Sequence, residues 1–195
     1  MAKLYVVMGK SATGKDTIYQ MLLDNPEQNL KRIVPYTTRP VRAGEAEGRE
    51  YHFVSEETMK QMEEDGKIIE CRTYQTVHGP WHYFTADDGQ IEGEQDCLLI
   101  GTLEGYEKLA RFFGPDRVVP IYIEVPDGIR LERALRREQK QAEPKYAEMC
   151  RRFLADEKDF SEQNLRRLGI DKRYVNLELS DCLGQIRNGM ENIEP

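Results

Sequence analysis

Long apolar stretches and paired cysteines are both missing from this chain of 195 residues. No apolar stretch approaches the roughly 20 residues that a membrane-spanning helix needs, and the N-terminus lacks the apolar core of a signal peptide. The four cysteines, Cys71, Cys97, Cys150 and Cys182, form no C-x-x-C pair, which argues against a disulfide framework or a zinc site. We therefore expect a cytoplasmic protein with no membrane partner.

An excess of positive charge is also missing. The chain has 28 Lys and Arg residues against 35 Asp and Glu residues, a net charge of −7. That balance argues against nucleic acid as the main partner. With 39% apolar and 32% charged residues and no internal repeat, the composition is that of one globular domain with room for a small inserted subdomain.

The most informative segment that is present reads GKSATGKDT, at residues 9–17. An apolar run precedes it and an amphipathic segment follows, so we expect a strand before it and a helix after it. In the pattern G-x-x-x-x-G-K, Gly9 and Gly14 let the backbone turn tightly, the helix N-terminus attracts anions, and Lys15 adds a full charge. The alternative is a coincidental Gly/Lys turn. The expected polyphosphate-binding residues are Gly9, Lys10, Ser11, Ala12, Thr13, Gly14, Lys15, Asp16 and Thr17.

Asp16 departs from this pattern, because a Ser or Thr hydroxyl normally stands there and reaches Mg²⁺. A carboxylate also binds Mg²⁺ through oxygen, directly or through water. Its negative charge lies close to the bound phosphates, and only the metal or Lys15 offsets it. Asp16 is therefore the candidate metal-binding residue, and Mg²⁺ is the expected cofactor.

Strands and helices alternate along the chain, which predicts an α/β fold with a mainly parallel sheet flanked by helices. Ligands in such folds bind at the carboxyl ends of the strands. The region from 32 to 85 is rich in strands and turns and is predicted to be an insertion beside that sheet. The predicted strands are 4–8, 32–36, 51–54, 67–70, 97–100, 118–125 and 173–177, and the main helices are 15–23, 103–113, 126–137 and 181–190, with another after Pro144.

A second group of charged residues lies in the segment TTRPVRAGEAEGREYHF, residues 37–53. Arg39 and Arg42 are three residues apart in an extended stretch, and Tyr51 follows. Because a guanidinium group grips a phosphate with two parallel hydrogen bonds, these residues are a candidate second phosphate clamp. The alternative is a solvated basic turn.

With both motifs in place, the chain resembles guanylate kinase, whose acceptor region reads T-T-R-x-x-R-x-G-E-x-x-G-x-x-Y-x-F. The resemblance covers nearly the whole chain and implies a single domain, residues 1–195, with a P-loop NTPase-type fold. It implies a core at about 1–31, 86–135 and 155–195, a nucleoside-monophosphate-binding insertion at about 32–85, and a helical lid at about 136–154. The bound polyphosphate would be ATP.

The resemblance also implies roles for individual residues. Arg39, Arg42, Tyr51 and Tyr83 would contact the phosphate of GMP, and Thr85 would contact its base. Glu70 would face N1–H and the exocyclic amine of guanine, donors that adenine cannot present together. The alternative for Glu70 is an ordinary strand-end carboxylate.

Lid arginines of the family fall on Arg137 and Arg152, although the flanking Arg136 and Arg151 leave each assignment uncertain by one position. Cationic pairs near helix ends are alternatively just solvated. Asn176 matches a residue of the family that contacts adenine, and a turn-forming Asn explains that position nearly as well.

Four positions depart from the family pattern: Asp16, Pro35, which replaces a Ser that helps to hold the base, and Ile100 and Thr102, which replace acidic residues. Without the acidic residue at Thr102, part of the physical reason to prefer guanine is lost. An extra residue or so also lengthens the turn between residues 75 and 81.

These observations predict an enzyme that transfers a phosphoryl group directly, in line, from MgATP to GMP or dGMP. Lys15, Arg39, Arg137 and Arg152 are the expected catalytic residues. The partners are small molecules, and the protein is a monomer or a homodimer. G-K-D also occurs in ribose bisphosphate phosphokinases, which makes a kinase for another phosphorylated acceptor one alternative. A non-catalytic guanylate-kinase-like binding module is the other.

Overall fold

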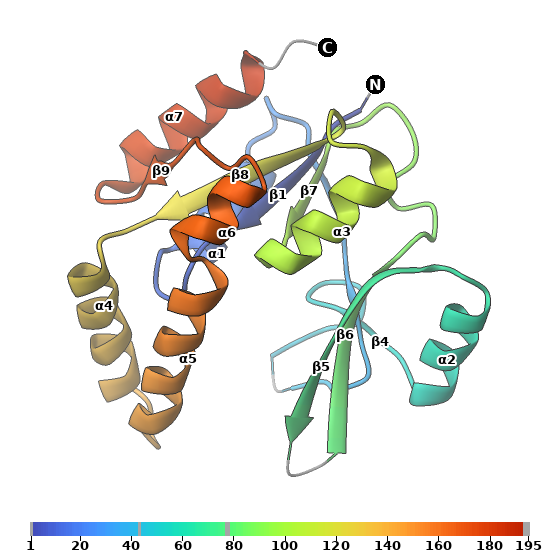
Figure 1. Cartoon of the computed structure of the whole chain (residues 1–195), viewed down its shortest axis with the longest axis horizontal. Helices are drawn as coiled ribbons and strands as arrows, with labels where there is room; N and C mark the ends of the chain where they lie inside the picture. The colour runs from blue at the N-terminus through green and yellow to red at the C-terminus, as the bar shows by residue number, and fades with distance from the viewer. Residues whose placement is uncertain (1, 43, 77–78, 193–195) are drawn as a thin grey trace.

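Five parallel strands form the main sheet of the computed structural model, which describes residues 2–42, 44–76 and 79–192 (Figure 1). Every neighbouring pair runs parallel, so the carboxyl ends of the strands share one edge. The segments that follow β1, β7, β8 and β9 therefore meet at that edge. The order is β2-β7-β1-β8-β9, with β1 Leu4–Met8, β2 Lys31–Arg32, β7 Cys97–Ile100, β8 Val118–Glu124 and β9 Tyr174–Val175.

Helices cover both faces of this sheet, because its central strands are apolar on both sides. In β1, Leu4, Val6 and Met8 belong to one core cluster, and Tyr5 and Val7 belong to the other. Each side chain buried in this way contributes about 1.5–3 kcal/mol. The first cluster includes residues of α3 (Leu103–Phe113) and α6 (Glu162–Arg167), and the second includes residues of α1 (Lys15–Leu23) and α7 (Leu179–Glu191).

A second, smaller sheet lies within the predicted insertion. Its two long strands form an antiparallel pair, and Met59 of the accompanying helix α2 (Glu56–Glu64) packs with Phe84 and Ala86. Ser55 caps α2, since its side chain accepts a hydrogen bond from the Thr58 amide. The strand order is β4-β3-β6-β5, with β3 Tyr36–Thr37, β4 His52–Phe53, β5 Ile68–Thr76 and β6 Gly79–Ala86.

The predicted strand 32–36 is wrong as a single element, because its two ends belong to different sheets. Lys31–Arg32 pairs with β7, whereas Tyr36–Thr37 pairs with β4 and β6. Between them, both backbone groups of Val34 bond to the side chain of Gln90, and Pro35 has no N–H to offer a neighbouring strand. The chain therefore leaves one sheet and enters the other within three residues.

Other elements also differ from the predictions. The strand predicted at 67–70 continues to Thr76. Residues 79–81, part of the turn expected between residues 75 and 81, instead begin β6, because the two strands pair as far as Thr76 and Gly79. Part of the lengthened turn, residues 77–78, lies outside the described residues. Helix α6 was not predicted from the sequence.

Helices α4 (Asp127–Gln139) and α5 (Tyr146–Asp159) pack against each other and extend beyond the main sheet. Pro144 lies just before α5 rather than within its first turn. In Figure 1 these helices and the pair β5–β6 project from the same side of the main sheet and form two arms. Within the described part of the chain, none of the helices has the length and apolarity that crossing a bilayer requires.

Candidate active site

The loop that follows β1 has the backbone of a phosphate-binding loop. A Cβ at Gly9 would lie 2.6 Å from the carbonyl oxygen of Ile123, so only glycine fits there. Gly14, with φ of 84°, caps α1 from a left-handed conformation that glycine adopts without strain. The loop therefore ends with the N-terminus of α1 and its unpaired N–H groups, which favour an anion.

Asn176, at the end of β9, holds this loop. Its side chain is buried and its Nδ2 donates to the carbonyl oxygen of Thr13 at 2.7 Å. A Cβ at Gly14 would come within 2.5 Å of the same Nδ2, so the contact also explains why residue 14 is glycine. The contact with adenine expected of Asn176 stays a prediction, and the support of the loop is an additional role that the sequence did not reveal.

Lys15 and Asp16 begin α1 and form an ion pair at 3.3 Å. The Asp16 side chain is 81% exposed, so its carboxylate is accessible beside the loop. The described residues contain no group of three or more His, Cys, Asp and Glu side chains able to hold a metal ion by themselves. Mg²⁺ in kinase sites typically takes one or two protein carboxylates and completes its shell with phosphate oxygens and water. Asp16 therefore fits a Mg²⁺ ion that arrives with the nucleotide.

Arg130 of α4 connects the phosphate loop to helix α5, and sequence reasoning missed it. Its side chain is 1% exposed and stacks on Phe153 of α5, with its Cζ atom 4.5 Å from the ring centroid. The guanidinium group donates to the Ser11 carbonyl oxygen at 3.2 Å and to the carboxylates of Asp127 and Glu157 at 2.7 and 2.6 Å. The spacing of Asp127 and Arg130, three residues apart on a helix, was the available signal.

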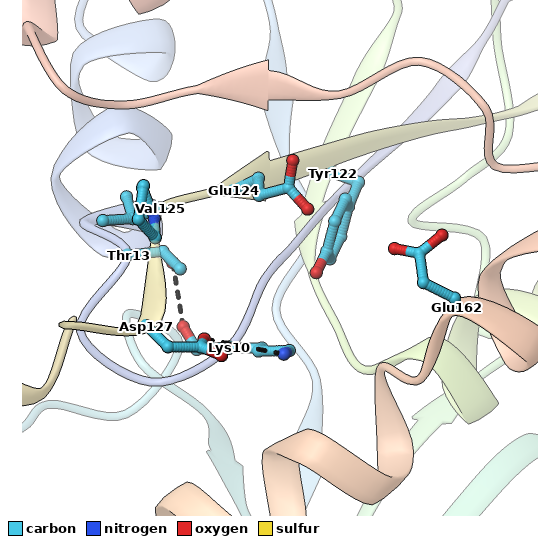
Figure 2. A pocket seen from close by; sticks show the side chains of 8 residues that line it. Lys10, Thr13, Tyr122, Glu124, Val125, Asp127 and Glu162 are labelled. Atoms are coloured by element: carbon cyan, nitrogen blue, oxygen red, sulfur yellow. Dashed lines mark hydrogen bonds and ion pairs between the residues drawn. The ribbon is translucent and has the colours of Figure 1, made fainter. Parts of the chain in front are cut away.

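The end of α5 also contacts the loop directly. The Ser11 amide donates to Asp156 at 2.6 Å, and the Lys10 ammonium donates to Glu157 at 2.8 Å. These contacts join the C-terminal end of α5, just beyond the lid predicted at about 136–154, to the phosphate loop. Beside the loop lies a cavity of about 260 Å³, and Figure 2 shows Lys10, Asp127 and Thr13 on one side of it and Glu162 on the other.

On the opposite arm, Arg39 is held in a buried aromatic and acidic setting. Its side chain is 3% exposed, and its two terminal nitrogens donate to the two oxygens of Glu45 at 2.6 and 2.7 Å. The guanidinium carbon lies 5.1 Å from the ring centroid of Tyr51 and 6.0 Å from that of Tyr83. The structure thus brings together three of the four predicted phosphate contacts, and we call Arg39, Glu45, Tyr51 and Tyr83 the acceptor clamp.

Electrostatics reinforce the acceptor clamp. The hydrogen bonds from Arg39 lower the pKa of Glu45 to about 2, and the same contact raises the pKa of Arg39. Arg39 Nε is buried and has no hydrogen-bond partner within the described part of the chain. Arg42, the fourth predicted contact, is exposed and lies over the ring of Trp81 at 6.0 Å, at the rim of the clamp. Glu45 was part of the recognised motif, but its role as the partner of Arg39 was missed.

Farther along the same sheet, Glu70 is buried and paired. Its Oε1 accepts a hydrogen bond from Thr85 Oγ1 at 2.9 Å, and its Oε2 accepts one from Arg72 Nε at 3.2 Å. A buried carboxylate must be hydrogen-bonded to be tolerated, and these two donors satisfy it. The predicted base-reading pair, Glu70 and Thr85, is therefore in contact across β5 and β6.

The lid arginines also meet. Arg137 of α4 and Arg152 of α5 line one cavity of about 90 Å³, together with Lys145 and Glu148. Arg152 donates to Glu148 at 2.8 Å, whereas the side chain of Arg137 has no hydrogen bond or ion pair with any residue that the structure describes. The flanking arginines do not line this cavity: Arg136 pairs with Glu132 and Arg151 pairs with Glu148.

A family model described as guanylate kinase matches residues 1–168. The chain belongs to the guanylate kinase family. It is 28% identical over 193 residues to the guanylate kinase of Porphyromonas gingivalis, with 97% of each chain covered. It is 32% identical over 151 residues to that of Caldanaerobacter subterraneus, which covers 77% of this chain and 69% of the relative.

A solved structure supports the same fold. The crystal structure of guanylate kinase from Anaplasma phagocytophilum superposes with a TM-score of 0.68 at 22% identity, covering 97% of this chain and 85% of that one. The expected resemblance and the α/β fold with a mainly parallel, helix-flanked sheet are therefore confirmed.

Three of the four residues that depart from the guanylate kinase pattern have identifiable positions in the fold. Thr102 caps α3, where its Oγ1 accepts a hydrogen bond from the Gly105 amide at 3.2 Å. Ile100 ends β7 and packs against the core cluster on the α1 and α7 side of the main sheet. Pro35 lies in the crossing between the two sheets. Both Thr102 and Ile100 therefore have structural roles in place of the missing carboxylates.

Proposed function

We propose that this chain transfers the γ-phosphoryl group of ATP to GMP or dGMP by direct in-line transfer, producing ADP and GDP or dGDP. The observation that carries the proposal is that Tyr83 of the acceptor clamp lies on β6 two residues from Thr85, which contacts Glu70 of β5. That arrangement offers an anion site and a base-reading carboxylate in one molecule that also has a phosphate-binding loop. The names of the relatives support it, since they are called guanylate kinases.

The phosphate loop and Lys15 hold the donor. Backbone N–H groups at the start of α1 face its phosphates, and the Lys15 ammonium adds a full charge. Asp16 would hold Mg²⁺, which would supply further charge neutralisation. The acceptor phosphate is already anionic, so no general base is required. Catalysis then consists of aligning two anions and offsetting their repulsion.

The lid completes the site on closure. Arg137 and Arg152 lie on the arm opposite the acceptor clamp, and inward movement of α4 and α5 would carry them to the transferring phosphoryl group. Closure also excludes water, which suppresses hydrolysis of ATP. The contacts of Asp156 and Arg130 with Ser11 attach the base of this lid to the phosphate loop.

The test is a coupled assay of ADP release with MgATP and a panel of acceptors: GMP, dGMP, AMP, CMP, UMP and ribose bisphosphate. We expect turnover with GMP and dGMP. Turnover with the ribose bisphosphate alone would identify a kinase of the alternative class. Tight binding of GMP without turnover would identify a non-catalytic module.

Two variants sharpen the assay. Lys15→Ala should lose nearly all transfer, by about a thousandfold or more, because the donor phosphates lose their full positive charge. Lys60→Ala, on an exposed position of α2, is the matched control and should keep the wild-type rate. Equal rates in both variants would show that Lys15 takes no part in phosphoryl transfer.

Other expectations belong to the same proposal. The partners are the two nucleotides, with no nucleic acid and no membrane, and the location is the cytoplasm. The acidic net charge and the unpaired cysteines support these expectations. The protein is expected to be a monomer or a homodimer, which sedimentation measures directly.

A further inference from the structure

Arg72 lies between the two halves of the proposed acceptor site. It follows Glu70 by two residues on β5, and it is the cross-strand neighbour of Tyr83, just as Glu70 is the neighbour of Thr85. Its hydrogen bond to Glu70 shows that both side chains are on the same face of the sheet. Arg72 therefore occupies the position between the acceptor clamp and the base-reading carboxylate.

Most of the hydrogen-bonding capacity of Arg72 is unused. A guanidinium group has five N–H donors, and Nε alone donates, to Glu70 at 3.2 Å, within the part of the chain that the structure describes. The side chain is 21% exposed, so the remaining donors face a partly open space. Burial raises the pKa of Tyr51, and the positive charges of Arg39 and Arg72 oppose that rise, which places Arg72 near the clamp as well.

A guanine base needs such a donor. Its N1–H and 2-amino groups are donors that suit Glu70, but its 6-carbonyl oxygen is an acceptor. Thr85 donates its only hydroxyl proton to Glu70, and Pro35 has neither a side-chain donor nor an N–H. Arg72 has N–H groups to spare directly beside Glu70.

We propose that Arg72 determines the base preference of the acceptor site by donating a hydrogen bond to the 6-carbonyl oxygen of a purine whose N1–H faces Glu70. The preferred acceptors are then 6-oxopurine monophosphates, and a 6-aminopurine is rejected because its amino group meets the guanidinium donors. This inference rests on the proposed function and adds a residue that reads the base.

The experiment compares Arg72→Ala, Arg72→Lys and wild type with three acceptors: GMP, IMP and AMP. IMP keeps the 6-carbonyl group and N1–H but lacks the 2-amino group. Calorimetry measures each Kd, and steady-state assays measure kcat and KM. Arg111→Ala is the matched control, because it removes an exposed arginine on α3 that also pairs with a glutamate. It should change none of these constants.

Arg72→Ala should raise the Kd and KM for GMP and for IMP by the same factor, about tenfold to a hundredfold, as expected for the loss of a charge-assisted hydrogen bond. The kcat value and the KM for ATP should stay within about threefold of wild type, because the phosphates are held elsewhere. The weak binding of AMP should not weaken further. Arg72→Lys should recover part of the preference, since an ammonium group still donates, and it carries the test if the alanine variant does not fold.

Two results would overturn the inference. An equal loss for GMP, IMP and AMP would mean that Arg72 acts on the phosphate or on the structure of the sheet. A loss for GMP without a loss for IMP would mean that it acts on the 2-amino group through Glu70. The proposed function is tested independently of this inference. If wild type binds GMP without turnover, the proposed function is contradicted, but the Kd values of the Arg72 variants still test the role of Arg72.

Discussion

The acceptor clamp and the lid cavity contain nearly the same contact in two environments. In the clamp, Arg39 donates to Glu45 at 2.6 Å, and in the lid, Arg152 donates to Glu148 at 2.8 Å. Both glutamates have a pKa of about 2, that of Glu45 because of Arg39 and that of Glu148 because of Arg151 and Arg152. The difference is exposure, since the side chain of Arg39 is 3% exposed and that of Arg152 is 58% exposed.

Exposure decides what each pair does. Removing one partner of a buried pair leaves an uncompensated charge and costs about 3–5 kcal/mol, whereas an exposed pair contributes about 0–1 kcal/mol. The clamp is therefore preassembled and suited to binding the acceptor. In the lid, Arg152 has an exposed partner that a phosphate group readily replaces, and the side chain of Arg137 pairs with no described residue. Both properties suit residues that engage only on closure.

Between the clamp and the lid, the larger effect on kcat is expected in the lid. The double variant Arg137→Ala, Arg152→Ala should lower kcat by about a hundredfold to a thousandfold, because arginines that meet the transferring phosphoryl group stabilise the transition state. The KM for GMP should change by less than about threefold. Steady-state kinetics at saturating ATP measure both constants. A large rise in KM with kcat intact would show that the lid binds the acceptor and would remove the contrast with the clamp.

The clamp should respond in the opposite way. Arg39→Lys keeps the charge but loses the planar fork, so we expect the KM for GMP to rise by about tenfold to a hundredfold while the KM for ATP is unchanged. Arg42→Lys, at the exposed rim, should raise the KM for GMP by less than about tenfold. Initial rates over a range of GMP concentrations measure these values. Equal effects at both positions would mean that burial does not distinguish them.

The clamp pair Arg39–Glu45 should also stabilise the folded protein more than the lid pair Arg152–Glu148 does. Glu45→Gln should lower the free energy of unfolding by about 3 kcal/mol at pH 7, because Arg39 is left buried without a counter-charge. The pKa of Glu45 in the folded protein, about 2, is below the value of 4.5 for a free glutamate. The stabilisation is therefore complete above about pH 4.5 and is lost as the pH falls toward 2. Urea unfolding of wild type and variant at several pH values tests this, and a gap that stays constant down to pH 2.5 would contradict it.

The smallest effect is expected at Glu148. Glu148→Gln should lower the free energy of unfolding by no more than about 0.5 kcal/mol at low salt, and 1 M NaCl should abolish the difference, because exposed charges are screened. The gap caused by Glu45→Gln should survive in 1 M NaCl. Urea unfolding at two salt concentrations measures both, and a salt-resistant loss at Glu148 would show that the lid pair is as well organised as the clamp.

Several parts of the fold and site were predictable because their signals are local. The phosphate loop between β1 and α1 follows from glycine spacing and apolar periodicity, and the buried strands β7 and β8 follow from continuous apolar runs. Arg39 and Tyr51 were grouped from their spacing within residues 37–53, whereas Tyr83, more than 40 residues from Arg39, was added only through the family resemblance.

Other contacts had no signal of this kind. Arg130 reaches Ser11 across 119 positions of the chain, and Asp156 reaches the same residue across 145. The three-residue spacing of Asp127 and Arg130 indicates that pair, but no spacing indicates either contact with Ser11, since charged residues on helices are ordinarily solvated. The crossing at Pro35 was missed for a related reason: two short strands in sequence are indistinguishable from one strand until their pairing partners are known.

Local order in this protein thus comes from its amino-acid pattern: where the backbone turns, which strands are apolar on both sides and where a helix begins. Which charges lie buried together was decided only when distant segments packed, as in Arg39 with Glu45 inside an aromatic setting and Arg72 beside Glu70. The physical reason is that the pKa and the interaction energy of a charged group depend on its surroundings. Desolvation and neighbouring groups are properties of the packed molecule, and residue spacing along the chain does not contain them.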